Sequence, residues 1–407
     1  MTKAGFAHAR HVLVLNSGSS SLKFGLFAVT AGEVRVVVSG AAEYTLHKLM
    51  RFRAMDAQHV QVCEETQPWV GVAEVVSRIA RLLEDWGAPA PQAVGHRVVH
   101  GGPDLRQHRG IDEAVLSQLQ AAQAWAPLHT PAVLAGIRQA QREYAGLPQM
   151  ACLDTAFHAN LPAVAQTLPL PAPLRAQGLK RYGFHGLSCE SVVRQLEATP
   201  HAAPRLLVAH LGSGASLTAV REGVSVDTSM GLTPSGGLIM GTRSGDMDPG
   251  VLIYLAREKG YDAASLEALL DHRSGLVGIS GLSGDMRVLH AAAPTNPQAA
   301  LAIEMFVYAV RKQLAALWVV LGGADALVFT GGIGEHDAVV RAAVCEGLGA
   351  LGVQLDPVRD AALTNPVSTP ASSCRVWVLP SMENEQVARH TADWLVRDAN
   401  RSGETVI

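Results

Sequence analysis

The 407-residue sequence has few charged residues and few cysteines, and each shortage excludes a class of protein. Charged residues make up 17% of the chain and the formal net charge is −3, so there is no electrostatic basis for binding nucleic acid or an anionic membrane. The five cysteines are odd in number and form no C-x-x-C pair, which argues against a disulfide framework and a zinc site. We therefore expect reduced, mostly buried thiols.

Long apolar runs and the common nucleotide-binding motifs are also missing. The uninterrupted apolar run directly before Asn16, VLVL, is only four residues long, and the most hydrophobic later segment, 301–321, contains Glu304, Arg311 and Lys312. These features predict no signal peptide, no transmembrane span and a cytoplasmic location. Neither G-x-x-x-x-G-K-[ST] nor G-x-G-x-x-G occurs, which excludes the P-loop and Rossmann sites at the level of motif.

What is present indicates a globular α/β protein of at least two domains. Apolar residues make up 48% of the chain, and its length exceeds that of one ordinary core. Residues 12–29 read as strand, polar loop and strand, with a third strand at 33–40. Apolar residues three and four apart predict a helix at 72–86 that packs on this sheet. Strands at 93–102 and 149–154 follow, separated by a helix that begins with the capping pair Thr130-Pro131.

The second half of the chain repeats this opening. LLVAHLGSGASLTAV resembles VLVLNSGSSSLKFGLFAV, with Gly212-Ser213 aligned 194 residues after Gly18-Ser19. A duplication predicts two similar sheets around a cleft, with one Gly-Ser hairpin from each half at its floor. Further elements complete the pattern: a helix at 301–321, a strand that runs into glycines with a helix start at Glu335, a strand at 375–380 and a helix at 383–398.

The stretch 227–250 is too rich in glycine for a helix interior and dense in polar groups. It carries Arg243 between hydroxyl and carboxylate side chains, which suits binding of an anion and a metal ion. Asp248-Pro249 then predicts a capped helix that ends at Gly260. The alternative is a surface loop in which Arg243 pairs with its own aspartates.

Three further glycine turns, at 17–21, 212–214 and 331–335, offer backbone N–H groups to phosphate. Lys23 can reach a phosphate near the first turn unless it is an ordinary exposed strand lysine, and Asn16 offers an amide oxygen to a metal ion or its water. Arg97 stands among strand valines and needs an anionic partner, which is a substrate or an internal salt bridge. Asp154 ends a hydrophobic strand, a common position for a catalytic carboxylate. His185 precedes a predicted helix cap at Ser188, and its role stays open.

The chain resembles the acetokinase family, within the acetate and sugar kinase, heat-shock chaperone and actin superfamily. The resemblance runs from about residue 12 to 391 and depends on NSGSSSLKF, GHRVVHGG, CLDTAFH, RYGFHG, HLGSGAS, MGTRSGDMDPG and FTGGIGE, in family order. It implies a duplicated ribonuclease-H-like (actin-like ATPase) fold, a homodimer, and reversible transfer of the ATP γ-phosphoryl group to acetate with Mg²⁺, for which Mn²⁺ is a substitute. The predicted domains are residues 1–154 with 388–407, and residues 155–387.

The resemblance also implies roles for individual residues. Asp154, His185 and Arg243 would be catalytic, and Asn16 and Glu383 would hold the metal ion. Arg97 would bind the substrate carboxylate, beside an apolar pocket of Val99, Leu128, Phe184 and Pro234. ATP would contact Lys23, His210, Leu211, Gly212, Ser213, Gly214, Asp285, Met286, Arg287, Gly332, Ile333, Gly334, Glu335 and His336.

The family role of Asp154 as a proton donor or acceptor conflicts with simple acid–base chemistry. A small carboxylic acid resembles a Glu side chain, with a pKa of about 4.3, so it is already ionised at pH 7 and needs no general base. We expect Asp154 to orient a metal-bound water or an arginine instead.

Several positions depart from the family pattern. Ser213, His336 and Thr130 replace asparagines, Asn384 replaces the second of two glutamates, and Ser235-Gly236 replaces a bulkier, acidic pair beside Pro234. The last change bears on substrate size. One alternative is therefore a propionate or butyrate kinase, since one methylene group in an apolar pocket changes the binding free energy by only about 1–3 kcal/mol. Two further alternatives are a non-catalytic carboxylate sensor and an ATP-driven chaperone.

Overall fold

The computed structural model describes residues 9–18, 21–44, 49–68, 71–127, 129–201 and 203–402. The chain divides into two compact units: unit 1 comprises Met1–Ala156 with Met382–Ile407, and unit 2 comprises Phe157–Ser381. Within the described ranges, none of the helices combines the length and apolar character needed to cross a membrane.

Unit 1 is built on an eight-stranded sheet in the order β5-β4-β3-β2-β1-β6-β8-β7. The first five strands form an antiparallel meander, whereas β6 and β8 run parallel to β1. The predicted hairpin and third strand are confirmed. The next two strands were not predicted, although Met50, Phe52 and Ala54 are buried in alternation with exposed Arg51. The strands are β1 (Arg10–Ser17), β2 (Ser21–Val29), β3 (Val34–Tyr44), β4 (Leu49–Asp56), β5 (Gln61–Pro68), β6 (Ala93–Val98), β7 (Arg109–Gly110) and β8 (Gln149–Leu153).

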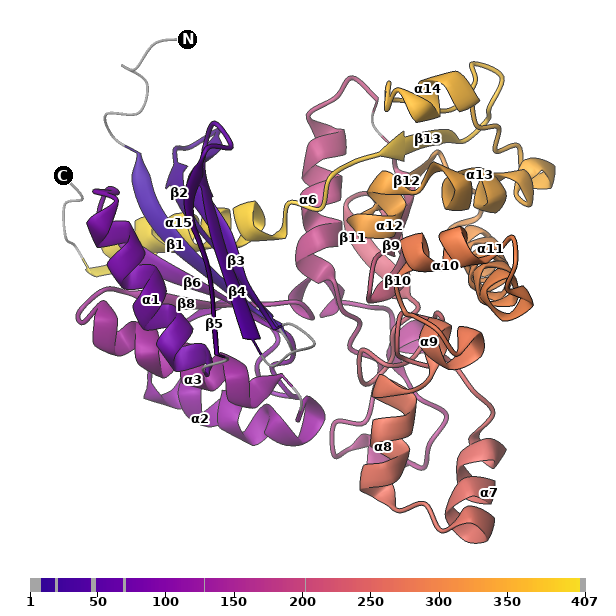
Figure 1. Cartoon of the computed structure of the whole chain (residues 1–407), viewed down its shortest axis with the longest axis horizontal. Coiled ribbons are helices and arrows are strands. Elements are labelled where there is room, and N and C mark those ends of the chain that lie inside the picture. Colours follow the sequence, from indigo (N-terminus) through magenta and orange to yellow (C-terminus); the bar gives the residue numbers. More distant parts are fainter. Residues whose placement is uncertain are drawn as a thin grey trace. The chain divides into compact units, whose positions relative to one another are not determined.

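Helices of unit 1 cover this sheet. Helices α1 (Val72–Asp85), α2 (Glu113–Ala121) and α3 (Thr130–Glu143) lie together at one side of the sheet (Figure 1). The helix predicted at 72–86 is confirmed, and its buried face joins Leu13 and Phe24 in one core cluster. Helix α15 (Glu383–Ser402) packs on β6, where Val387 and Thr391 leave no room for a Cβ at Gly95.

The start of α3 differs from the prediction by one residue. His129 occupies the cap position without a side-chain cap bond, and Thr130 is the first helical residue. Pro131 therefore stands second in the helix, where its missing N–H is still harmless because the first-turn N–H groups have no helical partner.

Unit 2 repeats the central topology of unit 1. Its five-stranded sheet has the order β11-β10-β9-β12-β13, with β9 antiparallel to β10 and parallel to β12. The corresponding strands of unit 1, β3-β2-β1-β6-β8, have the same order and directions. The predicted duplication of a ribonuclease-H-like α/β fold is confirmed. The strands are β9 (Arg205–Leu211), β10 (Ala215–Arg221), β11 (Val224–Thr228), β12 (Ala326–Thr330) and β13 (Arg375–Val378).

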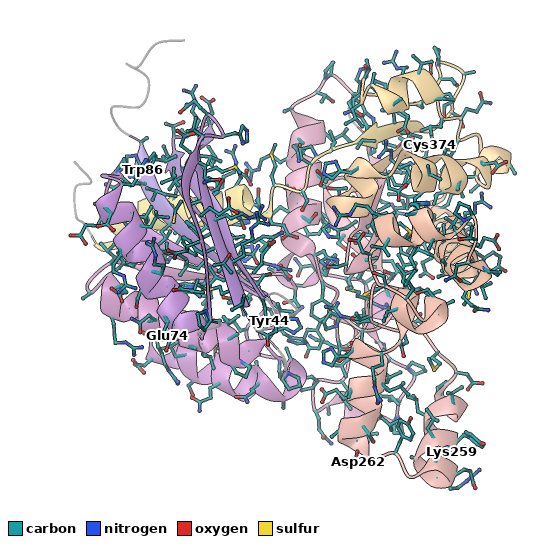
Figure 2. The ribbon with its side chains drawn as sticks, viewed as in Figure 1. Tyr44, Glu74, Trp86, Lys259, Asp262 and Cys374 are labelled. Carbon is teal, nitrogen blue, oxygen red and sulfur yellow. The ribbon has the colours of Figure 1, made fainter. Side chains whose placement is uncertain are left out.

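The helices of unit 2 include one that the sequence predicted in detail. Helix α7 (Pro249–Lys259) begins with Asp248 accepting from Gly250 N and ends at left-handed Gly260. Lys259 and Asp262 mark the turn to the next helix (Figure 2). The remaining helices include α4 (Ala163–Gln166), α5 (Ala172–Arg175), α6 (Gly186–Glu197), α8 (Ala263–His272), α9 (Gly275–Ser280), α10 (Met286–Ala292), α11 (Pro297–Leu321), α12 (Gly331–His336), α13 (Ala338–Glu346) and α14 (Pro357–Ala361).

The cysteines are free thiols, as expected. Cys152, Cys189, Cys345 and Cys374 are buried and Cys63 is partly exposed. Burial raises the pKa of Cys345 and of Cys374 to about 12, which makes these two thiols unreactive at neutral pH.

Candidate active site

Polar side chains gather in unit 1 at the carboxyl ends of three neighbouring strands. Asn16 comes near the end of β1, Arg97 near the end of β6, and Asp154 directly after β8. The strand register pairs Asn16 with Arg97 and Arg97 with Cys152, so the three residues lie side by side. We call Asn16, Arg97 and Asp154 the unit 1 cluster.

Arg97 binds both other members of this cluster. Its Nε donates to Oδ1 of Asp154 at 2.9 Å, its Nη2 donates to Oδ2 at 2.5 Å, and its Nη1 donates to Oδ1 of Asn16 at 3.0 Å. Asn16 is held in turn, because its Nδ2 donates to Oδ1 of Asn384 at 3.0 Å. The internal salt bridge considered for Arg97 is therefore present, and Asp154 fixes the orientation of the guanidinium.

The electrostatics of the cluster involve Glu383, the first residue of α15. Burial raises the pKa of the Asp154 carboxyl, Arg97 opposes this shift, and Glu383 adds to it, so the pKa lies above its ordinary value. Burial would lower the pKa of Arg97, but the negative charges of Asp154 and Glu383 raise it overall. The guanidinium is therefore charged at every working pH.

Other predicted residues of unit 1 lie nearby in the sheet or outside the described ranges. Lys23 is exposed on β2, opposite Asn16 in the antiparallel register. Val99 follows β6 and is buried. Leu128 and the tip of the first glycine turn, residues 19–20, lie outside the described residues.

In unit 2, three cationic or ionisable side chains point at the glycine turns. A Cβ built on Gly214, in the turn between β9 and β10, would lie 3.2 Å from Nε2 of His185 and 3.5 Å from Nη1 of Arg243. A Cβ on Gly331 would lie 3.2 Å from Nε2 of His210. We call His185, His210 and Arg243 the unit 2 cluster. Glycine at these places keeps the space beside the three side chains open.

His185 adopts a backbone conformation that is rare for a residue with a side chain. It is the cap residue of α6, with φ 56° and ψ 25°, so the prediction that Ser188 caps this helix is wrong and Ser188 lies inside its first turn. Its Nδ1 lies 2.9 Å from Oγ of Ser216, and its ring stacks on His210 with centroids 4.1 Å apart. Such strain persists only where surrounding contacts hold it, and it is common at functional sites.

His158 provides one of these contacts. Its Nε2 lies 3.0 Å from the carbonyl oxygen of Phe184, and its Nδ1 lies 2.8 Å from Oγ of Ser225. A carbonyl oxygen only accepts, so the proton is on Nε2, and Nδ1 accepts from the serine. Burial lowers the pKa of His158 to about 4. A neutral histidine thus holds the backbone directly before His185, and Phe184 itself is buried.

Arg243 is held by the loop that carries it. Its Nη1 donates to the carbonyl oxygen of Pro234 at 3.1 Å. The two aspartates of the loop stabilise its backbone: Asp246 accepts from Gly237 N at 2.7 Å, and Asp248 caps α7. Gly241 N donates to Ser213 O at 3.1 Å, which joins this loop to the glycine turn after β9.

Most of the remaining predicted nucleotide contacts lie in or directly beside the short helices α10 and α12 of unit 2. The helix predicted to start at Glu335 starts at Gly331, because left-handed Gly331 turns the chain directly after β12. Glu335 Oε1 accepts from Gly331 N and from Ser381 N, each at 3.0 Å. Asp285 caps α10 and forms an exposed ion pair with Arg287. Leu211 is buried in β9, Met286 is buried, and His336 is exposed. Gly332, Ile333 and Gly334 lie within α12.

A comparison with models of protein families shows which family the chain belongs to. Residues 11–389 match the model of the acetokinase family. The chain belongs to the acetokinase family. It is 40% identical over 400 residues to the acetate kinase of Nitrobacter hamburgensis, covering 96% of this chain and 98% of that one. It is an enzyme of the class that transfers phosphoryl groups to carboxylates.

Solved structures of acetokinase-family enzymes have the same fold. A propionate kinase from Francisella tularensis superposes with a TM-score of 0.86 at 35% identity, covering 94% of this chain and 99% of that one. The acetate kinase of Porphyromonas gingivalis has a TM-score of 0.83 at 33% identity, covering 95% and 100%.

In this acetokinase-family chain, some residues that support the clusters were not predicted from the sequence. Ser188, Ser216 and Ser381 contact the two stacked histidines directly or through one another, and Arg341 binds the carbonyl groups of α12. Serines give no sequence signal of this kind, since they are common on surfaces and in helix caps. Arg341 sits among apolar residues in AVVRAAV, which was a usable sign of a buried charge.

Proposed function

We propose that the protein is an acetate kinase that transfers the γ-phosphoryl group of ATP to acetate, giving acetyl phosphate and ADP, and that also runs in reverse. The observation that carries this proposal is the unit 1 cluster. Three of the five N–H groups of Arg97 are engaged by Asp154 and Asn16, and two remain to bind a carboxylate. Val99, Leu128, Phe184 and Pro234 are proposed to contact the methyl group.

The unit 2 cluster supports a role in binding ATP and stabilising the transferring phosphoryl group. His185 and Arg243 flank the open space at Gly214, and His210 faces Gly331. Backbone N–H groups of glycine turns bind phosphate well. We assign His185 and Arg243 to the negative charge that develops in transfer, and the remaining predicted nucleotide residues, Lys23 included, to ATP.

The unit 1 cluster also fits a magnesium ion by its donor chemistry. Mg²⁺ prefers oxygen ligands from one or two carboxylates plus phosphates and water. Glu383 acts electrostatically on both Arg97 and Asp154, and the amide oxygen of Asn16 has a second lone pair beside the one that Arg97 uses. Asn16 and Glu383 would hold the ion, which would neutralise phosphate charge when bound.

The chain's own residues then have to position the reactants and balance charge, since the nucleophile needs no base. Arg97 orients the carboxylate, and Asp154 orients Arg97. His185 and Arg243 donate to the phosphoryl oxygens as negative charge grows on them. Such positioning and charge neutralisation are the main contributions in phosphoryl transfer, where one arginine contributes roughly 10³ to 10⁵ in rate in other enzymes.

The test compares acetate, propionate and butyrate side by side. With ATP, Mg²⁺ and hydroxylamine, acetate should give the acyl hydroxamate with the highest kcat/KM. A higher kcat/KM with propionate would favour the runner-up, which the Francisella tularensis propionate kinase structure and the small Ser235-Gly236 pair keep open. Absence of product with all three acids would favour a carboxylate sensor. ATP hydrolysis stimulated by unfolded peptide but independent of carboxylate would indicate a chaperone.

The oligomeric state and location are part of the same proposal. We propose a cytoplasmic homodimer with two folded domains, which the sequence predicts at 1–154 with 388–407 and at 155–387; since 387 lies within α15, we place the second limit before this helix. Helix α7 has no buried residue although it is apolar, with Ile253 59% and Tyr254 48% exposed. On α11, Tyr308 is 67% and Val319 77% exposed. Exposed apolar surface of this kind is typical of subunit interfaces.

A further inference from the structure

Two serine hydroxyl groups in unit 2 form a directed chain that ends on His210. We propose that Ser188 and Ser381 are positioning residues that hold His210 as the neutral tautomer with its proton on Nε2, directed at the phosphates of the nucleotide. The assignment of the phosphates rests on the proposed function, whereas the tautomer follows from the hydrogen bonds of the protein alone.

The direction of the chain follows from its partners. Ser381 Oγ donates to Ser188 Oγ at 3.0 Å, and Ser188 Oγ lies 2.8 Å from Nδ1 of His210. Ser188 is completely buried, in the first turn of α6. Its single hydroxyl proton needs an acceptor, because a buried donor without one is costly. Ser381 already donates to it, so Ser188 donates to Nδ1. The ring proton of His210 is therefore on Nε2.

The protonated nitrogen faces the open glycine turns. A Cβ built on Gly331 would lie 3.2 Å from Nε2 of His210, and one on Gly212 would lie 4.0 Å from it. A donor at this place adds to the backbone N–H groups that these turns offer to phosphate. With the opposite tautomer, Nε2 would carry a lone pair and repel phosphate oxygens.

Because the rings of His185 and His210 stack, a neutral His210 avoids repulsion of a positively charged His185. Their rings lie 4.1 Å apart between centroids with an interplanar angle of 20°. Two positive charges at this separation would repel each other strongly in a partly buried site. Since His185 is the member assigned to the transferring phosphoryl group, a His210 kept neutral by Ser188 allows His185 to carry positive charge.

Ser381 also ties this chain to the glycine turn after β12. Its backbone N–H donates to Oε1 of Glu335 at 3.0 Å, and the same oxygen accepts from Gly331 N at 3.0 Å. The hydroxyl that orients His210 and the turn that His210 faces are therefore anchored to one carboxylate oxygen. This anchoring fixes the position of the Nε2–H group relative to the backbone N–H donors of the turn.

The tautomer is measured first, without any assay of activity. In the full-length protein labelled with ¹⁵N-histidine, the ring signals of His210, assigned by their loss in His210→Gln, should show a protonated Nε2 and an unprotonated Nδ1. Ser188→Ala should give a mixture of tautomers, and Ser188→Thr, which keeps the hydroxyl, should retain the wild-type pattern. A wild-type His210 with its proton on Nδ1 would overturn the proposal.

Kinetics with matched variants test the role toward the nucleotide. Ser188→Ala should raise KM for ATP about five- to tenfold, the effect of one hydrogen bond, and leave KM for acetate unchanged. Ser381 is partly exposed and lies at the end of the hydrogen-bonded series farthest from His210. Ser381→Ala should also raise KM for ATP, and it replaces Ser188→Ala in this test if that variant fails to fold. The control is Ser191→Ala, a buried serine of the same helix whose hydroxyl donates to Ser188 O.

The outcomes separate this inference from the proposed function. An equal rise in KM for ATP in Ser191→Ala would show a general effect of loosening α6 and would overturn the inference. So would a Ser188→Ala protein with wild-type KM for ATP. A protein that transfers no phosphoryl group yet shows His210 protonated on Nε2, with the mixture appearing in Ser188→Ala, would refute the proposed function and support the tautomer assignment.

Discussion

The bond between Asp154 and Arg97 predicts a specific kinetic defect. Replacing Asp154 with Asn keeps an oxygen acceptor but removes the charge, so Arg97 loses its charge-assisted hydrogen bonds. Such bonds contribute about 1.5–3 kcal/mol, which corresponds to roughly 10- to 100-fold. We expect KM for acetate to rise by this factor in Asp154→Asn, with a smaller change in KM for ATP, in steady-state measurements at pH 7.

A matched pair elsewhere in the chain serves as the control. Arg205 and Asp325 form the same kind of ion pair at 2.6 Å, at the start of β9. Asp325→Asn should leave both KM values unchanged. If Asp154→Asn lowered kcat alone and left KM for acetate at the wild-type value, Asp154 would act on the transfer step and not through Arg97.

For individual residues, the sequence predicts the need for a partner but not which residue that partner is. Arg97 and Asp154 were predicted as a buried charge and a strand-end carboxylate, because burial of charge requires a partner. That they partner each other could not be predicted, since 57 residues separate them and only the parallel pairing of β6 and β8 brings them together. The left-handed backbone of His185 was also unpredictable, because tertiary contacts and not its residue type maintain it.

Among the elements, local patterns predicted the hairpin of β1 and β2, helix α1 and both ends of α7. Each of these has its signal within a few residues: alternation, a 3.6-residue period, or a cap with proline and glycine. Strands β4 and β5 have eight residues each, like β1, and were missed because β5 is mostly polar and β4 carries two arginines between its buried residues. The start of α12 was misplaced because glycines predict a turn and give no sign of where the helix begins.

The six-residue helix α12 is too short to be stable by itself and depends on a buried arginine. Arg341 is 2% exposed, and its Nη1 donates to the carbonyl oxygens of Gly334 and Glu335 at 3.0 and 2.9 Å. Its Nε donates to Asp360 Oδ1 at 2.7 Å. We expect Arg341→Met to lower the free energy of unfolding by about 3–5 kcal/mol, because Asp360 is left buried and unpaired.

The matched double variant separates stability from positioning. Arg341→Met with Asp360→Leu removes the unpaired charge, so thermal denaturation should show that much of the lost stability returns. In the single and the double variant alike, the carbonyl groups of α12 lack their donor. KM for ATP should therefore be raised in both, while KM for acetate is unchanged. A double variant with both normal stability and normal KM for ATP would show that Arg341 does not hold the nucleotide turn in place.

At the scale of the whole molecule, the duplicated fold assigns one guanidinium to each unit. Arg97 lies near the end of a strand of the first sheet, and Arg243 lies in a loop of unit 2. The proposed function assigns Arg97 to the carboxylate and Arg243 to the transferring phosphoryl group, so one reaction requires both residues. Neither unit could then catalyse transfer alone.

A double-mutant cycle tests this joint action. Arg97→Lys and Arg243→Lys each keep the positive charge but lose the planar fork that binds two oxygens at once. If both forks act on one transition state, the losses in log kcat/KM will not add, and the coupling should be about 0.5–3 kcal/mol. Arg205→Lys, which alters the exposed ion pair at the start of β9, should combine additively with Arg97→Lys and gives the baseline. Purely additive losses for the pair Arg97 and Arg243 would mean that the two arginines serve separate steps, and their assignment to one transfer step would have to be abandoned.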